Sequence, residues 1–481
     1  MKKSEITRRD ALKVMGLTGI ATIAPGIAYA DSERKNQKRP NLIFILTDDQ
    51  RYDAMANMGR FPWLKTPNLD RLVDEGVRFD NAFVTTSLCS PSRASFLTGC
   101  YANCHGVIIN GTLDPKPEIQ TFPQVLQKVG YETAYVGKWH MAPGDHARSG
   151  FDYWVSFSGQ GQYYDCQMNK NGEKFVAKKY ITDELTEHAV EFINKEHKKP
   201  FMIYLSHKAV HGPFTPAERH KDLYNDIELE PLDDPNDVVE DKPKWMQAAM
   251  KKGRKDEKVA PPRKMIKDYL RGISAVDDGI GKILDTLEEK GILDDTAIVF
   301  AGDNGFFFSE HGGLGDKRKA YEQSIRIPLI MRYPRMVKAG TKNSGLVLNI
   351  DLAPTFLELA QAEIPPTVQG KSWMSVLSGK EKGRESFLYE YYDEHIYRNT
   401  DQFKSTPTSI AIRTKRWKLI TFPELEDEID ELYDLQDDPG ELRNLIKKPE
   451  YAPQVRQMRQ RLEGIKKQIG YVKPKPIETE K

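Results

Sequence analysis

The chain has 481 residues and a formal net charge of +1, with 71 lysines and arginines against 70 aspartates and glutamates. This length exceeds the size at which one hydrophobic core stops growing, so we expect two domains, the first of them large. The near-equal numbers of acids and bases argue against a nucleic-acid-binding protein that depends on a basic face. Any recognition of anions must therefore be local.

The N-terminus predicts an export signal over residues 1–30. A charged start, Thr7-Arg8-Arg9-Asp10, is followed by an apolar run and by the small-residue cleavage site Ala28-Tyr29-Ala30. The paired arginines resemble a twin-arginine signal, which implies the twin-arginine export machinery as a partner. The apolar run is broken by Pro25 and is too short to span a bilayer comfortably. We expect an exported protein without a stable membrane span, in the periplasm, with secretion or the cell surface as alternatives.

A charged linker is predicted over residues 31–39, and strand and helix patterns then alternate through residues 40–379. Continuous apolar runs mark strands that are buried on both faces, and the periodic segments between them mark helices. The predicted strands are Asn41–Leu46, Val77–Val84, Glu132–Val136, Phe201–Leu205 and Thr296–Phe300, and the predicted helices are Thr66–Asp74, Phe122–Val129, Asp183–Asn194 and Lys264–Lys290. This alternation favours an α/β fold, a large, mostly parallel sheet with helices on both faces. Polar motifs follow the strands, where such sheets bind ligands.

Residues 218–263 interrupt this pattern and are rich in charge and proline. We interpret them as an insertion on the surface, because loops of this length are usually functional or mobile. The insertion either covers the active site or is a solvated surface loop, and both interpretations remain open.

Residues 380–481 follow a different pattern, which predicts a smaller α+β domain packed on the large one. Short strands come first and a helix comes last, as in domains built on an antiparallel sheet. The predicted strands are Ser386–Tyr392, Ser409–Arg413, Trp417–Phe422 and Glu431–Leu435, and the predicted helix is Tyr451–Ile469.

The stretch from Leu88 to Gly99 predicts the start of a helix that holds an anion. Pro91 suits the first turn, because its missing N–H would have no partner there. Side chains four apart share a helix face, so we expect the Cys89 sulfur beside the Arg93 guanidinium. The first N–H groups and the positive end of the helix dipole point to the same place. A tetrahedral dianion would be favoured there.

The pattern Cys-x-Pro-Ser-Arg-(x)₄-Thr-Gly from Cys89 to Gly99 resembles the signature of the type I sulfatases of the alkaline phosphatase superfamily. In that family the cysteine is converted after translation to formylglycine (3-oxoalanine), an aldehyde that hydrates to a gem-diol. The resemblance therefore implies a formylglycine at position 89 and a formylglycine-generating maturation enzyme as a partner. The segment Glu431–Leu435, with Asp438-Pro439 and Glu441, resembles the sulfatase C-terminal signature. On this reading residues 40–379 are the catalytic sulfatase domain.

A metal site is implied at the ends of two predicted strands. The residues concerned are Asp48, Asp49, Asp303 and Asn304. Their carboxylate and amide oxygens suit a hard cation such as Ca²⁺ and are not what zinc or copper needs. In the family these positions hold calcium, which also binds the modified Cys89.

The resemblance assigns the sulfate to three cations, Arg93, Lys138 and Lys317, with Lys319 as an alternative to Lys317. It assigns His140 to the formylglycine hydroxyl and His211 to the bridging ester oxygen. The mechanism it implies begins when a gem-diol hydroxyl, activated by the metal and by Asp303 as base, attacks sulfur. His211 and Lys317 protonate or stabilise the leaving oxygen, and His140 helps the second hydroxyl to expel sulfate.

Sulfated carbohydrate is the predicted substrate. The run Ser206–His211 resembles that of bacterial polysaccharide sulfatases, including enzymes active on algal ulvan and on glycosaminoglycans. We place His207, Gln162 and Tyr163 in the substrate site, although the stretch that contains the last two could equally be ordinary surface. One alternative is a phosphonate monoester or phosphodiester hydrolase with the same nucleophile. Another is a sulfated-glycan-binding protein on an inactive sulfatase scaffold.

With Cys89 assigned to chemistry, three of the four cysteines remain, and at most one disulfide can form. This count argues against a disulfide scaffold or a Cys₄ zinc site. Cys100 and Cys104, one helical turn apart, are the nearest candidates for a disulfide, but the geometry is demanding. Both the free and the bonded states remain open.

Overall fold

The computed structural model describes residues 38–230, 232, 237, 239–247, 263–398, 406–426 and 429–477. The predicted export signal lies outside the described residues. Contacts divide the chain into two units, residues 1–39 and residues 40–481, and the fold described here is that of the second unit. No described helix is both long enough and apolar enough to cross a membrane.

A ten-stranded sheet forms the centre of this unit. Its strands follow in the order β13 (Thr341–Asn343), β2 (Val77–Phe79), β12 (Leu329–Arg332), β9 (Thr296–Gly302), β1 (Asn41–Thr47), β8 (Phe201–Ser206), β4 (Glu132–Lys138), β5 (Tyr153–Phe157), β6 (Gln167–Lys170) and β7 (Glu173–Val176). The five strands from β9 to β5 are all parallel to one another, whereas β12 pairs antiparallel with β9, β6 with β5, and β7 with β6. The predicted α/β class with a mostly parallel sheet is confirmed.

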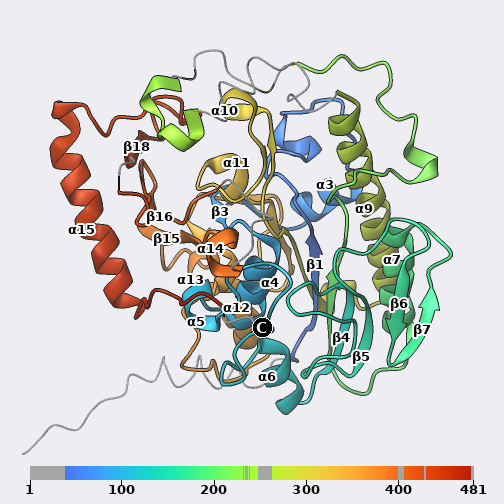
Figure 1. Cartoon of the computed structure of the whole chain (residues 1–481). Coiled ribbons are helices and arrows are strands. Elements are labelled where there is room, and N and C mark those ends of the chain that lie inside the picture. The colour runs from blue at the N-terminus through green and yellow to red at the C-terminus, as the bar shows by residue number, and fades with distance from the viewer. Residues whose placement is uncertain are drawn as a thin grey trace, which may run out of the picture. The chain divides into compact units, whose positions relative to one another are not determined.

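Helices cover both faces of this sheet, on opposite sides of β1 in Figure 1. One face packs against α3 (Pro67–Asp74), α7 (Ile181–Asn194) and α9 (Arg263–Glu289), and the other against α4 (Cys89–Thr98), α6 (Phe122–Lys128) and α12 (Leu352–Leu359). Strand β1 has apolar side chains on both of its faces, because both faces are covered. Leu42 and Phe44 enter one hydrophobic core and Ile43 and Ile45 enter the other, as expected of a strand buried on both faces.

The C-terminal part contains a four-stranded antiparallel sheet of β15 (Ser386–Tyr391), β16 (Ser409–Thr414), β17 (Trp417–Thr421) and β18 (Glu431–Asp434). Helix α15 (Ala452–Gln468) packs against it through Val455, Met458 and Leu462. The predicted antiparallel sheet is confirmed.

Short elements connect these layers. The helices are α5 (Ala102–His105), α10 (Glu310–Gly313), α11 (Glu322–Ile325), α13 (Met374–Leu377) and α14 (Glu394–Arg398), and the 3₁₀ turns are η1 (Ala56–Met58), η2 (Glu218–His220), η3 (Val239–Asp241), η4 (Leu293–Asp295), η5 (Asn349–Asp351) and η6 (Pro449–Tyr451). Two small sheets pair β3 (Ala82–Phe83) with β14 (Val347–Leu348), and β10 (Phe307–Phe308) with β11 (Gly315–Asp316).

Two expectations need correction. The predicted strand Val77–Val84 is two strands in different sheets, because Asp80 and Asn81 form a turn between β2 and β3. The insertion is not wholly on the surface. The ammonium group of Lys242 is buried and donates to the Tyr433 hydroxyl at 2.9 Å and to the Glu441 carbonyl at 2.5 Å, against the C-terminal sheet.

Gly137, beside Lys138 in β4, allows close approach of the neighbouring strand. It has φ 123°, and a Cβ there would overlap the Ser206 carbonyl oxygen of β8. Gly137→Ala is expected to lower the free energy of unfolding by about 3 kcal/mol or more, because strained φ and steric overlap each cost on the order of 1–3 kcal/mol. Denaturant unfolding measures this effect. Gly172→Ala is the matched control, since Gly172 has φ 102° and open space around it. Equal losses in the two variants would contradict the steric explanation.

Candidate active site

Four neighbouring strands of the large sheet deliver polar side chains to its carboxyl edge. Strand β1 is followed by Asp48 and Asp49, and β9 by Asp303 and Asn304. Strand β4 ends in Lys138, and β8 leads to the loop that carries His211. Because these strands pair directly with one another in parallel, residues far apart in sequence meet at one place.

Three carboxylates form the centre of the cluster. Oxygens of Asp48, Asp49 and Asp303 lie within 4.8 Å of one another, and all three residues are buried. The Asp49 N–H donates to Asp303 Oδ1 at 2.9 Å, and Asn304 Nδ2 donates to Asp49 Oδ1 at 2.7 Å. The predicted metal ligands are therefore brought together.

This cluster fits a hard cation. Asn304 Oδ1 is buried and has no hydrogen-bond partner among the described residues. Burial and the Asp48 charge raise the pKa of Asp303 to about 7, while Asp48, despite its burial, is held well below its usual pKa by Lys138 and other cations. A cation would relieve the repulsion between these two carboxylates, and an all-oxygen donor set suits Ca²⁺.

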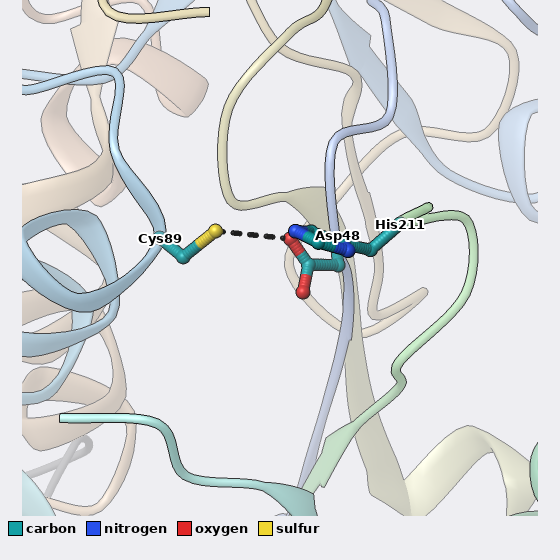
Figure 2. A group of neighbouring side chains, drawn as sticks. All are labelled: Asp48, Cys89 and His211. Carbon is teal, nitrogen blue, oxygen red and sulfur yellow. Dashed lines mark hydrogen bonds between the residues drawn. The ribbon is translucent and has the colours of Figure 1, made fainter. Parts of the chain in front are cut away.

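Cys89 occupies the first position of α4, directly after the extended residue Leu88. Its thiol donates to Asp48 Oδ1 at 3.3 Å and accepts from Lys317 Nζ at 3.0 Å. Figure 2 shows the sulfur pointing across the site towards Asp48 and His211. Burial and the nearby Asp48 carboxylate raise the pKa of the Cys89 thiol, so the unmodified side chain is a weak nucleophile.

Three buried cations surround the carboxylates. Arg93 Nε donates to Asp303 Oδ2 at 2.9 Å, and its Nη2 lies 3.3 Å from Asp48 Oδ2. Lys138 Nζ donates to Asp48, and Lys317 Nζ donates to Asp49. We expected the Cys89 sulfur to lie beside the Arg93 guanidinium. In the structure both side chains contact the same residue, Asp48.

Lys317, rather than Lys319, enters the site. Lys319 Nζ donates to the Lys317 carbonyl at 3.4 Å and lies 5.8 Å from the centre of the Phe307 ring. The residues on either side of Lys317, Asp316 and Arg318, have φ of 66° and 80°. Such strained conformations persist only where surrounding contacts hold them.

One of those contacts comes from β15 of the C-terminal sheet. The Tyr389 hydroxyl donates to the Arg318 carbonyl at 3.0 Å and lies 2.7 Å from Ser87 Oγ. Ser87 comes two residues before Cys89, and Arg318 directly follows Lys317. The buried Tyr389 hydroxyl therefore contacts both of the segments that carry Cys89 and Lys317.

The two predicted histidines both reach this region. The Ser90 hydroxyl donates to the His140 carbonyl at 2.5 Å and lies 3.4 Å from its Nδ1. His211 Nδ1 donates to the Gly212 carbonyl at 2.7 Å, so the neutral ring carries its lone pair on Nε2, which lies 3.8 Å from Asp49 Oδ2. Burial and Lys138 lower the pKa of His211 to about 4.

The predicted substrate contacts differ in exposure. Gln162 is exposed, but His207 and Tyr163 are 1% and 5% exposed. Burial lowers the pKa of His207 to about 4, and its ring nitrogens have no hydrogen-bond partner in the described part of the chain. The Tyr163 hydroxyl donates to the His211 carbonyl at 2.7 Å, and its ring stacks on Tyr180 at 5.4 Å. In the structure Tyr163 thus contacts the loop that carries His211.

Sequence reasoning missed three polar neighbours of the site. Gln160 accepts a hydrogen bond from Lys138. Ser206 Oγ donates to the Lys138 carbonyl at 2.8 Å and accepts from Arg93 at 2.5 Å. Lys208 is buried, with Nζ 4.8 Å from the centre of the Tyr163 ring. Ser206 and Lys208 both lie in the run Ser206–His211 that carried a resemblance, so the sequence held a signal for these two residues.

The remaining cysteines take no part in this cluster. Cys100, Cys104 and Cys166 are free thiols in the structure. Cys100 donates to the Thr367 carbonyl at 3.0 Å.

Comparisons with known proteins agree with this geometry. A family model described as Sulfatase matches residues 40–362, and one described as N-sulphoglucosamine sulphohydrolase, C-terminal, matches residues 309–468. The chain is 35% identical to an N-acetylglucosamine-6-O-sulfatase of Bacteroides thetaiotaomicron, over 94% of this chain and 90% of the relative. It is 28% identical to an ulvan-active sulfatase of Formosa agariphila, over 93% and 87% of the two chains.

A solved structure of a protein in complex with its substrate, D-glucosamine-2-N,6-O-disulfate, superposes with a TM-score of 0.78 at 34% identity, over 90% of this chain and 98% of that one. The Sulfatase model covers more than half of the chain, and the bacterial relative matches over nearly its whole length. The resemblance to sulfatases is therefore confirmed, and this chain is an enzyme of the sulfatase family.

Proposed function

We propose that the chain hydrolyses sulfate esters of a sulfated sugar, with a formylglycine made from Cys89 and with Ca²⁺. The observation that carries the proposal is the position of Cys89 Sγ, which lies between the carboxylate cluster and Lys317 at the start of a helix. The helix N-terminus and the surrounding cations provide a site for a tetrahedral anion.

The named relatives support a 6-O-sulfated glucosamine unit as the first candidate substrate. The bacterial relative is an N-acetylglucosamine-6-O-sulfatase, and the solved neighbour holds a 6-O-sulfated glucosamine. The relative named for ulvan supports a polymeric source of the sulfated sugar. A substrate of this kind suits an exported protein, so we propose that residues 1–30 direct the chain through the twin-arginine machinery to the periplasm. There residues 40–379 would act as the catalytic domain and residues 380–481 as its C-terminal subdomain.

Two groups complete the proposed chemistry. Asp48, Asp49, Asp303 and Asn304 would hold calcium together with the modified Cys89. The ion would stabilise negative charge on the sulfate and on the nucleophile. Formylglycine would supply a hydroxyl nucleophile in place of a thiol whose pKa is raised by burial and by Asp48. This change requires the formylglycine-generating enzyme as a partner.

The cations of the chain have a different role, which is to bind the sulfate group. Arg93, Lys138 and Lys317 carry three positive charges at fixed positions, each braced by a buried carboxylate. They would bind the sulfate oxygens and stabilise the negative charge that develops during sulfate transfer. Because their positions are already fixed, no reorganisation is needed. Lys317 Nζ, which already donates to the Cys89 sulfur at 3.0 Å, would also donate towards the leaving oxygen.

Asp303, His211 and His140 would carry out the proton transfers. Asp303 would be the base for the attacking hydroxyl, because its carboxylate belongs to the buried cluster that Cys89 faces. His211 presents Nε2 to the site, and bound sulfate would favour its protonated form as a donor to the leaving oxygen. His140 would assist the departure of sulfate from the nucleophile.

The chain produced with its maturation enzyme is expected to release sulfate from N-acetylglucosamine-6-sulfate, with a kcat/KM well above that for a phosphonate monoester or a phosphodiester. The Cys89 peptide should lose about 18 Da, the mass difference between cysteine and its aldehyde. Cys89→Ala should bind but not hydrolyse the sugar. A dominant phosphodiesterase rate would favour the alternative hydrolase, and full modification without sulfate release would favour a binding protein.

Calcium is expected to raise the midpoint of thermal unfolding by a few degrees, since an ion that binds only the folded state adds about 4 kcal/mol at 1,000 times its Kd. Asp303→Asn should lose most of this shift, because it removes one charge from the cluster. Asp437→Asn, at an exposed position, should keep it. A calcium shift that is equal in both variants would contradict the proposed ligand set.

Tyr163→Phe tests whether the Tyr163 hydroxyl positions His211. The change removes the 2.7 Å bond to the His211 carbonyl and little else, so kcat should fall about tenfold, the effect of about 1.4 kcal/mol, with KM nearly unchanged. Tyr164→Phe is the control, because the residue is 41% exposed and its hydroxyl contacts the Pro216 carbonyl at 3.4 Å and the Glu218 N–H at 3.1 Å rather than the His211 carbonyl. Equal kcat values for the two variants would count against a positioning role.

A further inference from the structure

The C-terminal helix and its flanking loops concentrate positive charge on one segment. Residues 443–477 contain ten lysines and arginines and only two acids, Glu450 and Glu463, in a chain whose total formal charge is +1. Six of these cations are exposed and form no ion pair with any described residue. We call this set the basic strip: Arg443, Lys447, Lys448, Arg456, Lys467 and Lys475.

Arg456 and Lys467 of the strip lie on α15, and the other four cations lie before or after this helix. The apolar face of α15 is already used. Val455, Met458 and Leu462 of α15 are buried against the C-terminal sheet. In Figure 1, α15 lies at the outer side of strands β15, β16 and β18, and no labelled element covers its far side. The apolar residues are therefore unavailable for insertion into a membrane, which basic amphipathic helices otherwise achieve through such a face.

The other four cations of the segment do have carboxylate partners. Arg459 pairs with Asp430 at 2.7 Å, Arg461 with Glu385 at 3.7 Å, Lys466 with Glu463 at 2.8 Å, and Lys473 with Glu424 at 2.9 Å. Each pair has at least one exposed member, and such surface pairs contribute only about 0–1 kcal/mol. They are weak enough to rearrange around a stronger anion.

Two of the strip's charges oppose the stability of the helix. Lys447 and Lys448 come directly before η6 and α15, and the first turn of α15 contains no acid. Cations at this end oppose the helix dipole, which favours acids there. Lys467, in the last turn of α15, is favourably placed, so helix stability explains that cation but not Lys447 and Lys448.

The strip is extended rather than compact. Arg456 and Lys467 lie eleven residues apart on α15, which a rise of about 1.5 Å per residue converts to roughly 16 Å along the axis. Cations separated in this way suit a chain that carries many anionic groups better than a single small anion.

We propose that the basic strip binds a sulfated polysaccharide at a second surface, separate from the catalytic residues. The choice of ligand rests on the proposed function, because a sulfatase that acts on a polymer meets a polyanion of this kind. Binding at the strip raises the local concentration of sulfated units near the enzyme. It therefore lowers KM for polymer and leaves small substrates unaffected.

The test compares two triple variants of the full mature chain. Lys447→Gln, Lys448→Gln and Arg456→Gln remove three charges from the strip. Lys128→Gln, Lys338→Gln and Lys342→Gln remove three exposed charges elsewhere. Heparin, a sulfated polysaccharide, is the probe on an affinity column. The strip variant should elute at clearly lower salt than the wild type, because fewer counterions are displaced on binding, and the control variant should elute close to the wild type.

Turnover gives a second readout. The strip variant should lose about five- to twentyfold in kcat/KM on a sulfated polymer and stay within twofold on N-acetylglucosamine-6-sulfate, in line with the loss of a tethering site. Equal elution of the two variants, or equal loss on polymer and monosaccharide, would overturn the inference. Retention on phosphatidylserine vesicles or DNA that is as salt-resistant as on heparin would also overturn it. Heparin retention that depends on the strip, without any sulfate release, would support it and refute only the proposed function.

Discussion

The mutual repulsion of three buried carboxylates is the constraint on which the site depends. Asp48, Asp49 and Asp303 lie at the ends of two adjacent strands, and none of them has access to bulk water. Such a cluster is stable only if positive charge enters with it. Arg93 and two lysines provide that charge in the structure, and they are the groups that we propose bind the sulfate ester. The same ion pairs that allow the strands to end in carboxylates therefore fix the positions of the proposed sulfate-binding cations.

The C-terminal sheet contributes to this arrangement although none of the predicted site residues lies in it. Tyr389 of β15 contacts the segments that carry Cys89 and Lys317. Glu322, just after the Lys317 loop, pairs with Arg413 of β16 at 3.1 Å. These contacts account for the persistence of left-handed residues around Lys317. The two parts of the chain are thus coupled in geometry at the active site.

Much of the fold and the site could be predicted because the strongest patterns are local. Strand β1 is apolar on both faces and ends in two carboxylates, and α4 starts at the expected cysteine. Lys242 and Tyr163 could not be placed in this way. Charge and proline around Lys242 predicted an insertion on the surface, but its ammonium group donates to buried acceptors from residues about 190–200 positions away. Tyr163 suggested a sugar contact, whereas its hydroxyl satisfies a backbone carbonyl 48 residues on. Such partners depend on tertiary packing, which no local pattern contains.

Charge balance within the active site bears on how a polymeric substrate is attracted. Three carboxylates and three cations nearly cancel, so the cluster has little field beyond its immediate surroundings, and salt screens what remains within about 10 Å. A bound calcium ion would add positive charge, but it would lie among buried groups. The exposed cations of the basic strip have no such compensation from described residues, and clustered surface charge of one sign is what steers polyanions at a distance. The protein thus separates two demands: buried, compensated charge fixes the geometry for chemistry, and exposed, uncompensated charge provides attraction.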